Sequence, residues 1–334
     1  MIQLEENKSI EKLTTIGVKA ITYRYCKIEE TSDLLNLLKS NSLPIKILGG
    51  GSNILWTKNF DGLTIHINTK GVSIEKETDS YIIVNIQAGE NWHEFVIWSI
   101  ENGYGGIENL ALIPGNVGAA PIQNIGAYGV ELKEVFLECS AIDLRSLKSK
   151  VFSIKECQFG YRDSIFKNQE KNNYIITSIK VQLSKKGHYK LATKYGDIEK
   201  LVGKAPLIPS NIAKAIIDIR TSKLPDPKQI GNCGSFFKNP IIDEVLFKNL
   251  IKKYTEMPNY SSKDGYKIPA AWLIEKLNYK GYRVGDAGVH EKQALILVNY
   301  GNSSGAEILK LSNKISKEVY EVFGINLVPE VNIW

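Results

Sequence analysis

Apolar and polar residues follow helical spacing in some stretches of the first hundred residues and strand spacing in others. Residues 32–38 are leucine-rich with helical spacing, and residues 44–48 have the pattern of a short strand. Further strand patterns and then an amphipathic helix follow the glycines at 49–51, namely at 54–56, 63–67, 81–88 and 91–102. Because a strand and not a helix follows those glycines, the pattern predicts an α+β fold and not a simple βαβ series.

Two features divide the later part of the chain. Residues 135–184 alternate as strands do, and 206–220 contain a helical pattern that ends before Pro225 and Pro227. Since proline cannot continue a helix, this break is the best candidate for a domain boundary. A last helix is predicted over 304–324, because it opens with a serine and glutamate capping box and stops at a glycine.

Residues 105–129 form an unusual segment with six glycines, two prolines and a single acidic residue. It is too apolar for a solvent-exposed linker. Glycine-rich, hydrophobic backbone of this length is typical of a buried irregular segment that approaches a large flat partner closely. A loop packed beneath another domain is the alternative.

The composition is that of a soluble globular protein. The chain has 334 residues, 43% of them hydrophobic and 23% charged, which excludes general disorder. At about 150 residues per domain, this length predicts two or three domains. No apolar run reaches the ~18 residues of a membrane helix, and Glu5 and Glu6 do not fit a secretory leader. We therefore expect a cytoplasmic protein without membrane insertion.

The charge pattern argues against a nucleic-acid partner. Lys and Arg total 42 against 36 Asp and Glu, but only five of the basic residues are arginine and the lysines form no like-charged block. A solvated lysine-rich surface is the simpler interpretation of the net charge of +6. The dispersed cysteines and histidines predict neither a metal site nor a disulfide framework. They are Cys26, Cys139, Cys157, Cys233, His66, His93, His188 and His290.

The glycine loop at residues 49–53 has the sequence Gly-Gly-Gly-Ser-Asn. It lacks the third glycine of the dinucleotide fingerprint, because position 54 is isoleucine, and no helix follows it. Consecutive N–H groups in a glycine turn still make a concave anion site, which suits a dinucleotide diphosphate. For the loop alone an ordinary tight turn is the alternative. Together with the apolar wall of 105–129, it favours a bound flavin.

Three further residues are candidates for chemistry. Arg162 is a scarce arginine among aromatic residues, and a structural ion pair with Asp163 is the alternative. Ser235 lies in 231–240, which we interpret as a small-residue turn leading into a buried strand; it is not a hydrolase elbow, and a plain turn serine is the alternative. Glu330 has apolar neighbours that would raise its pKa and suit acid chemistry, with a structural glutamate as the alternative.

Six motifs, taken in order, resemble those of the UDP-N-acetylenolpyruvoylglucosamine reductase (MurB) family. They are residues 47–53, 108–115, 121–129, 159–164, 231–240 and 329–330. The resemblance extends over almost the whole chain. Residues 193–197 and 223–227 are similar to the longer, type I branch of the family, which has a tyrosine loop that covers the substrate.

The resemblance implies both a fold and a domain organisation. The fold class would be α+β, with a two-part FAD-binding domain of the PCMH/vanillyl-alcohol-oxidase type and a smaller α+β substrate-binding domain. Residues 1–68 with 325–334 would form the first FAD-binding subdomain, 69–219 the second, and 220–324 the substrate-binding domain. The PCMH-type region would span about 17–185.

The resemblance also implies a reaction, a cytoplasmic step of peptidoglycan synthesis. NADPH would reduce non-covalently bound FAD, and the enolpyruvyl ether of UDP-N-acetylglucosamine would be reduced to UDP-N-acetylmuramate. By position, Arg162 and Glu330 match the pair that stabilises charge on the carboxylate, and Ser235 matches the proton donor. Serine is a weak acid, so this role requires a strongly basic intermediate such as an enediolate. We expect a monomer or weak dimer.

The family's binding positions can be transferred residue by residue. For FAD they are Gly49, Gly50, Gly51, Ser52, Asn53, Ile113, Gln123, Gly126 and Arg220. For the UDP-sugar they are Tyr128, Tyr195, Lys223, Asn239, Tyr260, Lys267 and Gln293. Cys233 is expected to pack and not to react. The chain has few residues after Glu330, unlike many members of the family. This difference bears on how rigidly Glu330 is held.

Two other functions compete with this interpretation. One is another FAD-dependent oxidase or dehydrogenase on the same fold, which the joint occurrence of Arg162, Ser235 and Glu330 argues against. The other is a non-enzymatic basic binding protein, which would be colourless and would show salt-dependent DNA affinity.

Overall fold

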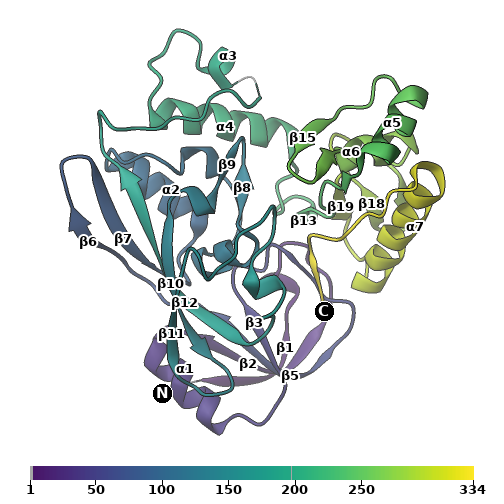
Figure 1. The fold of residues 1–334 in the computed structure, drawn as a ribbon. Helices are drawn as coiled ribbons and strands as arrows, with labels where there is room; N and C mark the ends of the chain where they lie inside the picture. The colour runs from purple at the N-terminus through teal and green to yellow at the C-terminus, as the bar shows by residue number, and fades with distance from the viewer. Residues whose placement is uncertain (1–2, 197) are drawn as a thin grey trace. The chain divides into compact units, whose positions relative to one another are not determined.

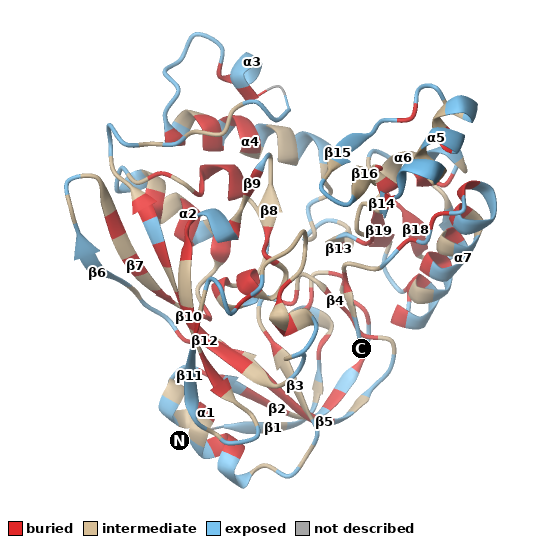
Figure 2. Ribbon diagram, viewed as in Figure 1, coloured by how far each residue is buried: buried red, intermediate tan, exposed pale blue. Residues whose placement is uncertain are grey.

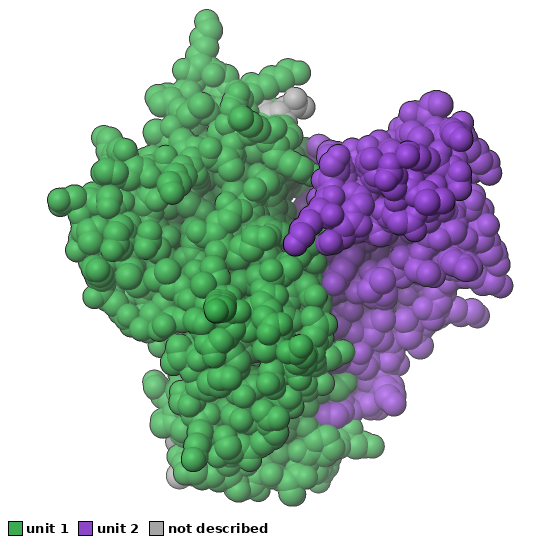
Figure 3. Space-filling model, viewed as in Figure 1, with its two compact units in different colours: residues 1–8, 23–50, 61–222 green, residues 9–22, 51–60, 223–334 purple. Residues whose placement is uncertain are grey.

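The computed structural model describes residues 3–196 and 198–334, so Asp197 of the 193–197 motif lies outside the described residues. The chain divides into two compact units, coloured separately in Figure 3. Unit 1 consists of Met1–Lys8, Tyr23–Gly50 and Asp61–Ser222. Unit 2 consists of Ser9–Thr22, Gly51–Phe60 and Lys223–Trp334, so the glycine loop at 49–53 crosses from one unit to the other.

The first sheet lies mostly in unit 1 and has the strand order β1-β2-β5-β3 (Figure 1). Its elements and the adjoining helix are β1 (Leu4–Ser9), β2 (Ile21–Ile28), α1 (Thr31–Ser40), β3 (Ile45–Leu48) and β5 (Phe60–Ile67). Leu34 and Leu37 of α1 form one buried cluster with Ile65 of β5. The glycine loop follows β3 directly, at the end of a strand that pairs in parallel with β5.

The second sheet of unit 1 is antiparallel, in the order β11-β10-β12-β7-β6. Its strands are β6 (Val72–Glu77), β7 (Tyr81–Gln87), β10 (Phe136–Asp143), β11 (Ser149–Ser153) and β12 (Tyr174–Ser184). Along β7 every second residue is buried, as expected for a strand with one face on a core. Figure 2 shows the buried residues concentrated on the central strands of this sheet.

Helices and short 3-10 turns of unit 1 contribute buried residues to the same core. They are α2 (Trp92–Glu101), η2 (Glu108–Leu110), η3 (Val117–Gln123), η4 (Leu132–Glu134), η5 (Ile165–Lys167), α3 (Ile198–Val202) and α4 (Pro209–Lys223). The small strands β8 (Gly126–Ala127) and β9 (Val130–Glu131) form a hairpin. Residues 105–129 are thus irregular, as the sequence predicts, and partly buried: residues 107–111 lie in the core, whereas Pro114, Ala119 and Gly129 are exposed.

Unit 2 contains a four-stranded sheet, β13-β19-β18-β17, and a three-stranded sheet, β14-β16-β15. Its elements are η1 (Glu11–Leu13), β4 (Ile54–Leu55), β13 (Gly231–Ser235), β14 (Ile241–Ile242), α5 (Glu244–Lys253), β15 (Tyr260–Ser262), β16 (Gly265–Lys267), α6 (Ala270–Lys276), β17 (Arg283–Val284), β18 (Ala287–Val289), β19 (Ile296–Asn299), α7 (Gly305–Phe323) and β20 (Asn332–Ile333). β20 pairs in parallel with β4, so the end of the chain is joined to residues that follow the glycine loop.

The last helix, α7, confirms the prediction made from its two ends. Ser304 and Glu307 form the capping box, and Gly324 closes the helix with a φ of 68°. Five apolar residues four or three apart, from Ile308 to Phe323, are buried along one face. Neither α7 nor any other helix in the described part of the chain is long and apolar enough to cross a membrane.

The structure corrects the interpretation of 231–240. The strand is Gly231–Ser235 itself, and the buried Phe236 and Phe237 follow it instead of forming it. The glycine that suggested a turn has a packing role, because a Cβ on Gly231 would lie 2.4 Å from the carbonyl oxygen of Ile16. Here a small residue permits close approach of two backbones within unit 2.

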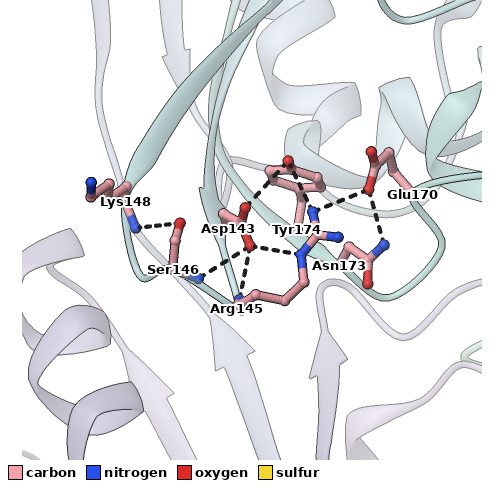
Figure 4. Close-up of polar contacts among 7 residues, drawn as sticks. All are labelled: Asp143, Arg145, Ser146, Lys148, Glu170, Asn173 and Tyr174. Atoms are coloured by element: carbon pink, nitrogen blue, oxygen red, sulfur yellow. Dashed lines mark hydrogen bonds and ion pairs between the residues drawn. The ribbon is translucent and has the colours of Figure 1, made fainter.

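A polar network closes the turn between β10 and β11 and lies apart from the motifs (Figure 4). The Asp143 carboxylate accepts hydrogen bonds from the backbone N–H of Arg145 at 2.8 Å and from its Nε at 3.3 Å. Arg145 also forms an ion pair with Glu170 at 3.6 Å. The hydrogen bonds from the backbone N–H and then the side chain of Arg145 lower the pKa of Asp143 to about 2. The scarce Arg145 thus has a structural partner in a turn.

Candidate active site

Two glycine-rich segments lie against each other in unit 1. A Cβ on Gly50 would lie 2.8 Å from the Cα of Gly115 and 2.9 Å from Oδ1 of Asn116. Asn116 in turn donates from Nδ2 to the carbonyl oxygens of Ile67 and Gly89. Any side chain at position 50 would therefore separate the glycine loop from the 105–129 segment.

The loop offers donors for an anion. Among the residues that the structure describes, no hydrogen bond has the N–H of Gly50, Gly51 or Ser52 as its donor. Gly51 is nevertheless buried and has a φ of 64°. A Cβ at this position would lie 2.0 Å from the carbonyl oxygen of Leu13, which belongs to unit 2 as Gly51 does. Since buried N–H groups need partners, these residues fit the diphosphate of a dinucleotide such as FAD.

The next candidates on the 105–129 segment have distinct surroundings. Ile113 is half-buried against the core of unit 1. The Gln123 side chain accepts a hydrogen bond from Nζ of Lys167 at 3.3 Å. The carbonyl oxygen of Gly126 accepts from Nη2 of Arg162, and a Cβ on Gly126 would lie 2.8 Å from Nη1 of the same guanidinium. Glycine at 126 thus lets Arg162 lie directly on the backbone.

Arg162 is held in an uncommon conformation. Its φ is 52°, a left-handed value that costs a non-glycine residue free energy. The guanidinium lies 5.4 Å from the centroid of the Tyr161 ring. Beside it, the Asp163 carboxylate accepts from Nδ2 of Asn168 at 3.0 and 3.1 Å. Backbone strain at a functional position is commonly balanced by the surrounding structure, and here Gly126 and the Tyr161 ring contact the arginine.

Tyr128, Tyr195 and Arg220 come together in unit 1. The two tyrosine rings meet edge to face with centroids 6.3 Å apart, and the charge of Arg220 acts on the Tyr128 hydroxyl group. Burial raises the pKa of Tyr128 and lowers that of Arg220. Nε of Arg220 is buried and has no partner among the described residues. A buried donor that has no partner within the protein is available to a bound ligand.

In unit 2, Ser235 and Glu330 are brought close by backbone pairing. The N–H of Glu330 donates to the carbonyl oxygen of Phe236 at 2.8 Å, and the N–H of Phe236 donates to Leu295 at 2.8 Å. Asn53 of the glycine loop donates from Nδ2 to the Glu330 carbonyl oxygen at 3.3 Å. The two predicted catalytic residues of this unit are therefore linked to each other and to the loop through main-chain atoms.

The Ser235 side chain is exposed, and no hydrogen bond among the described residues uses its hydroxyl group. Cys233, two residues earlier, is buried, donates to the carbonyl oxygen of Ile54 at 3.3 Å and has its pKa raised by burial to about 12. The residues after Glu330 are anchored as well, since the N–H of Trp334 donates to Leu55 at 2.8 Å.

Comparison with known proteins identifies the family. Residues 226–334 match the model of the UDP-N-acetylenolpyruvoylglucosamine reductase C-terminal domain, and residues 22–145 match an FAD binding domain. The UDP-N-acetylenolpyruvoylglucosamine reductase of Flavobacterium johnsoniae is 48% identical, covering 99% of this chain and 100% of its own. That of Bdellovibrio bacteriovorus is 43% identical, covering 100% of both chains.

The chain belongs to the UDP-N-acetylenolpyruvoylglucosamine reductase family. Its fold agrees with the crystal structure of UDP-N-acetylenolpyruvylglucosamine reductase (MurB) from Thermus caldophilus, with a TM-score of 0.68 at 19% identity over 100% of this chain and 99% of that one. Membership confirms the expected fold class, the FAD cofactor and the class of enzyme, an FAD-dependent oxidoreductase.

The remaining positions predicted from the sequence to bind substrate lie in unit 2. Tyr260 and Lys267 are cross-strand partners, with Nζ of Lys267 5.8 Å from the Tyr260 ring centroid. Oδ1 of Asn239 accepts from the N–H of Ala270 at 2.9 Å, and Oε1 of Gln293 accepts from the N–H of Leu295 at 3.4 Å. Lys223 is exposed at the end of α4.

Sequence reasoning assigned no role to two polar residues of unit 1, His93 and Asn109. Nδ1 of His93 accepts from the N–H of Leu112 at 3.1 Å, so the neutral ring carries its proton on Nε2. Burial lowers the pKa of His93, the charge of Glu94 opposes this shift, and the charge of Arg220 adds to it. Asn109 is buried and bonds to two distant backbone carbonyls. A histidine on the polar side of a predicted helix and one amide among apolar residues give no local signal of these contacts.

Proposed function

We propose that the chain reduces the enolpyruvyl ether of UDP-N-acetylglucosamine to UDP-N-acetylmuramate, a step of peptidoglycan synthesis, with NADPH as the source of hydride. The observation that carries this proposal is the full-length identity of 48% with a relative named UDP-N-acetylenolpyruvoylglucosamine reductase. The proposed substrates are a UDP-sugar and NADPH, the proposed location is the cytoplasm, and the proposed state is a monomer or weak dimer.

The chemistry defines what the protein has to supply. FAD, when bound, supplies hydride to the terminal carbon of the substrate's carbon–carbon double bond. The electron pair of that bond then moves to the inner carbon and into the adjacent carboxylate, so negative charge grows there. The protein must stabilise this charge and deliver one proton to the inner carbon. One hydride and one proton together convert the vinyl ether to a lactyl ether.

We assign the proton to Ser235. Strand pairing of β13 with β19 fixes its backbone, and its hydroxyl proton is not used in any hydrogen bond among the described residues. A serine hydroxyl gives up its proton only to a strong base, and the enediolate formed after hydride addition is one. The alkoxide left on Ser235 is then reprotonated from solvent, because the side chain is exposed.

We assign charge stabilisation to Arg162 and Glu330. A planar guanidinium meets a carboxylate with two parallel N–H donors, and the hydrogen bond to Gly126 sets the plane of Arg162. Glu330 contributes as a hydrogen-bond donor only in its protonated form, since an ionised carboxylate would repel the substrate carboxylate. Its backbone position is fixed by the bond from its N–H to Phe236.

The binding residues divide by ligand in the same proposal. For FAD, the glycine loop would hold the diphosphate and Arg220 would donate through its unpaired Nε, with Ile113, Gln123 and Gly126 along the 105–129 segment. For the UDP-sugar, Lys267 and Lys223 would meet diphosphate, and Tyr260 lies beside Lys267. The other proposed substrate positions are Tyr128, Tyr195, Asn239 and Gln293.

We also propose the functional division of the chain that the family suggests. Residues 1–68 with 325–334 and residues 69–219 would form the two parts of the FAD-binding domain, and 220–324 the substrate-binding domain. The parallel pairing of β20 with β4 supports the assignment of the chain's last residues to the first part.

The test separates the two half-reactions under anaerobic conditions. The purified protein, reconstituted with FAD, is first mixed with NADPH while the loss of oxidised-flavin absorbance is followed. The reduced enzyme is then mixed with the enolpyruvyl sugar nucleotide, and we expect the oxidised spectrum to return with formation of UDP-N-acetylmuramate.

Two results would contradict the proposal. If reduced flavin is reoxidised by oxygen or a simple carbonyl compound but not by the sugar nucleotide, the chain is a different FAD-dependent oxidase or dehydrogenase. If reconstitution gives a colourless protein with salt-dependent DNA affinity, it is a binding protein.

A further inference from the structure

The segment that carries Tyr195 is anchored on its N-terminal side by contacts with the rest of unit 1. It leaves β12 at Ser184, which exchanges backbone hydrogen bonds with Gly105 at 2.9 Å. The Tyr189 hydroxyl then donates to the carbonyl oxygen of Gly103 at 2.7 Å, and the Tyr189 ring lies where a Cβ of Gly105 would be, 2.8 Å away. These contacts fix the start of the segment, residues 184–189.

Asn109 provides the next anchor, three residues before Tyr195. The residue as a whole is 1% exposed. The amide Nδ2 donates to the carbonyl oxygen of Ala192 at 2.8 Å and to that of Tyr128 at 2.9 Å. Both N–H groups of one amide are therefore used, and they join the Tyr195 segment to the backbone of Tyr128.

The two residues joined in this way carry side chains that touch. A Cβ on Gly129 would lie 3.2 Å from the Cβ of Tyr195, and the rings of Tyr128 and Tyr195 meet edge to face. Tyr128 has a φ of 49° and Gly129 a φ of 84°, so this turn holds an uncommon backbone conformation. The carbonyl oxygen that Asn109 binds belongs to the strained residue itself.

Asn109 is not the residue that packing alone would select. Its Oδ1 is buried and has no hydrogen-bond partner among the described residues. Leucine has nearly the same shape without an unpaired acceptor, whereas aspartate keeps the shape but has no N–H to donate. What the amide adds at this position is therefore the pair of donated hydrogen bonds.

We propose that Asn109 is a positioning residue that sets the Tyr195 segment on the Tyr128–Gly129 turn, and so orders the tyrosine pair for the UDP-sugar. The inference rests on the proposed function for its ligand, but the link between Asn109 and the segment does not. It predicts that loss of the amide weakens substrate binding through Tyr195 and leaves FAD binding unchanged.

The first experiment measures the order of the segment without substrate. Lys190 and Lys194 are exposed on either side of Ala192, so trypsin cleavage there reports local opening. In FAD-reconstituted protein, we expect Asn109→Leu to speed cleavage at these lysines by about tenfold, because, of the two donated hydrogen bonds that are lost, it is the one to Ala192 that holds this segment. Asn109→Asp should speed it further, because its carboxylate faces two carbonyl oxygens. Unchanged cleavage in both variants would overturn the inference.

The second experiment is a double-mutant cycle on the affinity for the enolpyruvyl sugar nucleotide. We expect Asn109→Leu to weaken binding by about tenfold in the native background and by less than about twofold in the Tyr195→Ala background. Equal effects in the two backgrounds would mean that Asn109 does not act through Tyr195.

Asn299→Leu is the matched control for losing a buried amide. Asn299 is 5% exposed in unit 2 and donates to the carbonyl oxygens of Ile16 and Gly17. It should lower the unfolding temperature without speeding cleavage at Lys190 and Lys194. If the native chain does not bind or reduce the sugar nucleotide, the proposed function fails, while the cleavage experiment still decides whether Asn109 holds the segment.

Discussion

Arg162 in unit 1 and Ser235 in unit 2 are positioned in opposite ways. The side chain of Arg162 is tied to the Gly126 carbonyl, and its own backbone has a left-handed φ of 52°. Ser235 lies on a strand paired with β19, and its hydroxyl is left out of the hydrogen bonds among the described residues. The arginine is ordered through its side chain, and the serine through its main chain.

The difference follows from what each residue is proposed to do. A charge-stabilising group acts best when its donors already point in a fixed direction, because no reorganisation is then needed as charge develops. A proton donor has to part with its proton, so a hydrogen bond that held the hydroxyl elsewhere would compete with transfer. Arg162 is therefore a guanidinium held in one direction, and Ser235 carries an uncommitted hydroxyl on a fixed strand.

The sharpest test removes the uncommitted hydroxyl. Ser235→Ala should leave flavin reduction by NADPH nearly unchanged and slow reoxidation by the sugar nucleotide by about 10³-fold or more, the range of general acid catalysis. Anaerobic stopped-flow measurement of each half-reaction gives both rates. Cys233→Ala is the control on the same strand, and it should change reoxidation by only a few fold. Equal slowing of both half-reactions by Ser235→Ala would make the serine structural.

Arg162 is tested first by replacing its guanidinium group and then by changing Gly126, which its side chain contacts. Arg162→Lys keeps the charge but loses the paired donors, and we expect reoxidation to slow by about 10²-fold. Gly126→Ala should act in the same direction more weakly, since its Cβ would meet Nη1 of Arg162 while the charge remains. The exposed Arg283, which pairs with Asp286 at 2.6 Å, gives the control Arg283→Lys. A normal rate for Arg162→Lys would exclude bidentate recognition.

Two glycines of unit 2 allow the free-energy cost of a left-handed φ to be separated from the cost of a steric clash. Gly17 and Gly51 share a φ of 64°, but a Cβ on Gly17 meets nothing within 4 Å, whereas on Gly51 it would lie 2.0 Å from the Leu13 carbonyl oxygen. We expect Gly17→Ala to cost about 1 kcal/mol of unfolding free energy and Gly51→Ala about 3 kcal/mol or more. Urea unfolding of both variants measures this, and equal costs would show that only φ matters.

Much of the fold follows from local sequence, whereas the site depends on contacts between distant residues. The capping box of Ser304 and Glu307 lies within one helical turn, so sequence alone predicts the start of α7. The bonds of Asn109 reach residues 19 and 83 positions away, and no local pattern indicates them. The strand at 231–235 was missed because Gly231 resembles a turn until its approach to Ile16 is known. Recognition of the site therefore required whole motifs in order.

The last prediction compares a half-buried histidine of unit 1, His66, with a buried histidine of unit 2, His290. In unit 1, Nδ1 of His66 lies 2.7 Å from the Tyr25 hydroxyl, and burial, with the charges of Lys27 and Lys70, lowers the pKa of His66 to about 4. Burial also lowers the pKa of His290 in unit 2, where Glu291 opposes the shift. Both rings are therefore neutral in the folded protein near neutral pH.

The sign of the pH effect follows from these directions. A folded pKa below the unfolded value means that the unfolded chain binds the extra proton first, so stability is complete above about pH 6.5 and falls as pH decreases toward about 4. For His66 the loss is at most about 3 kcal/mol. Unfolding free energies should be measured from about pH 7.5, which is near neutral, down to about pH 4.5, which is near the folded pKa of His66. Over this range they should fall less for His66→Gln than for the native chain. His188 is exposed, so the His188→Gln variant should follow the native curve. The His290→Gln variant should differ from the native curve less than the His66→Gln variant does, because the charge of Glu291 favours protonation of His290 in the folded state.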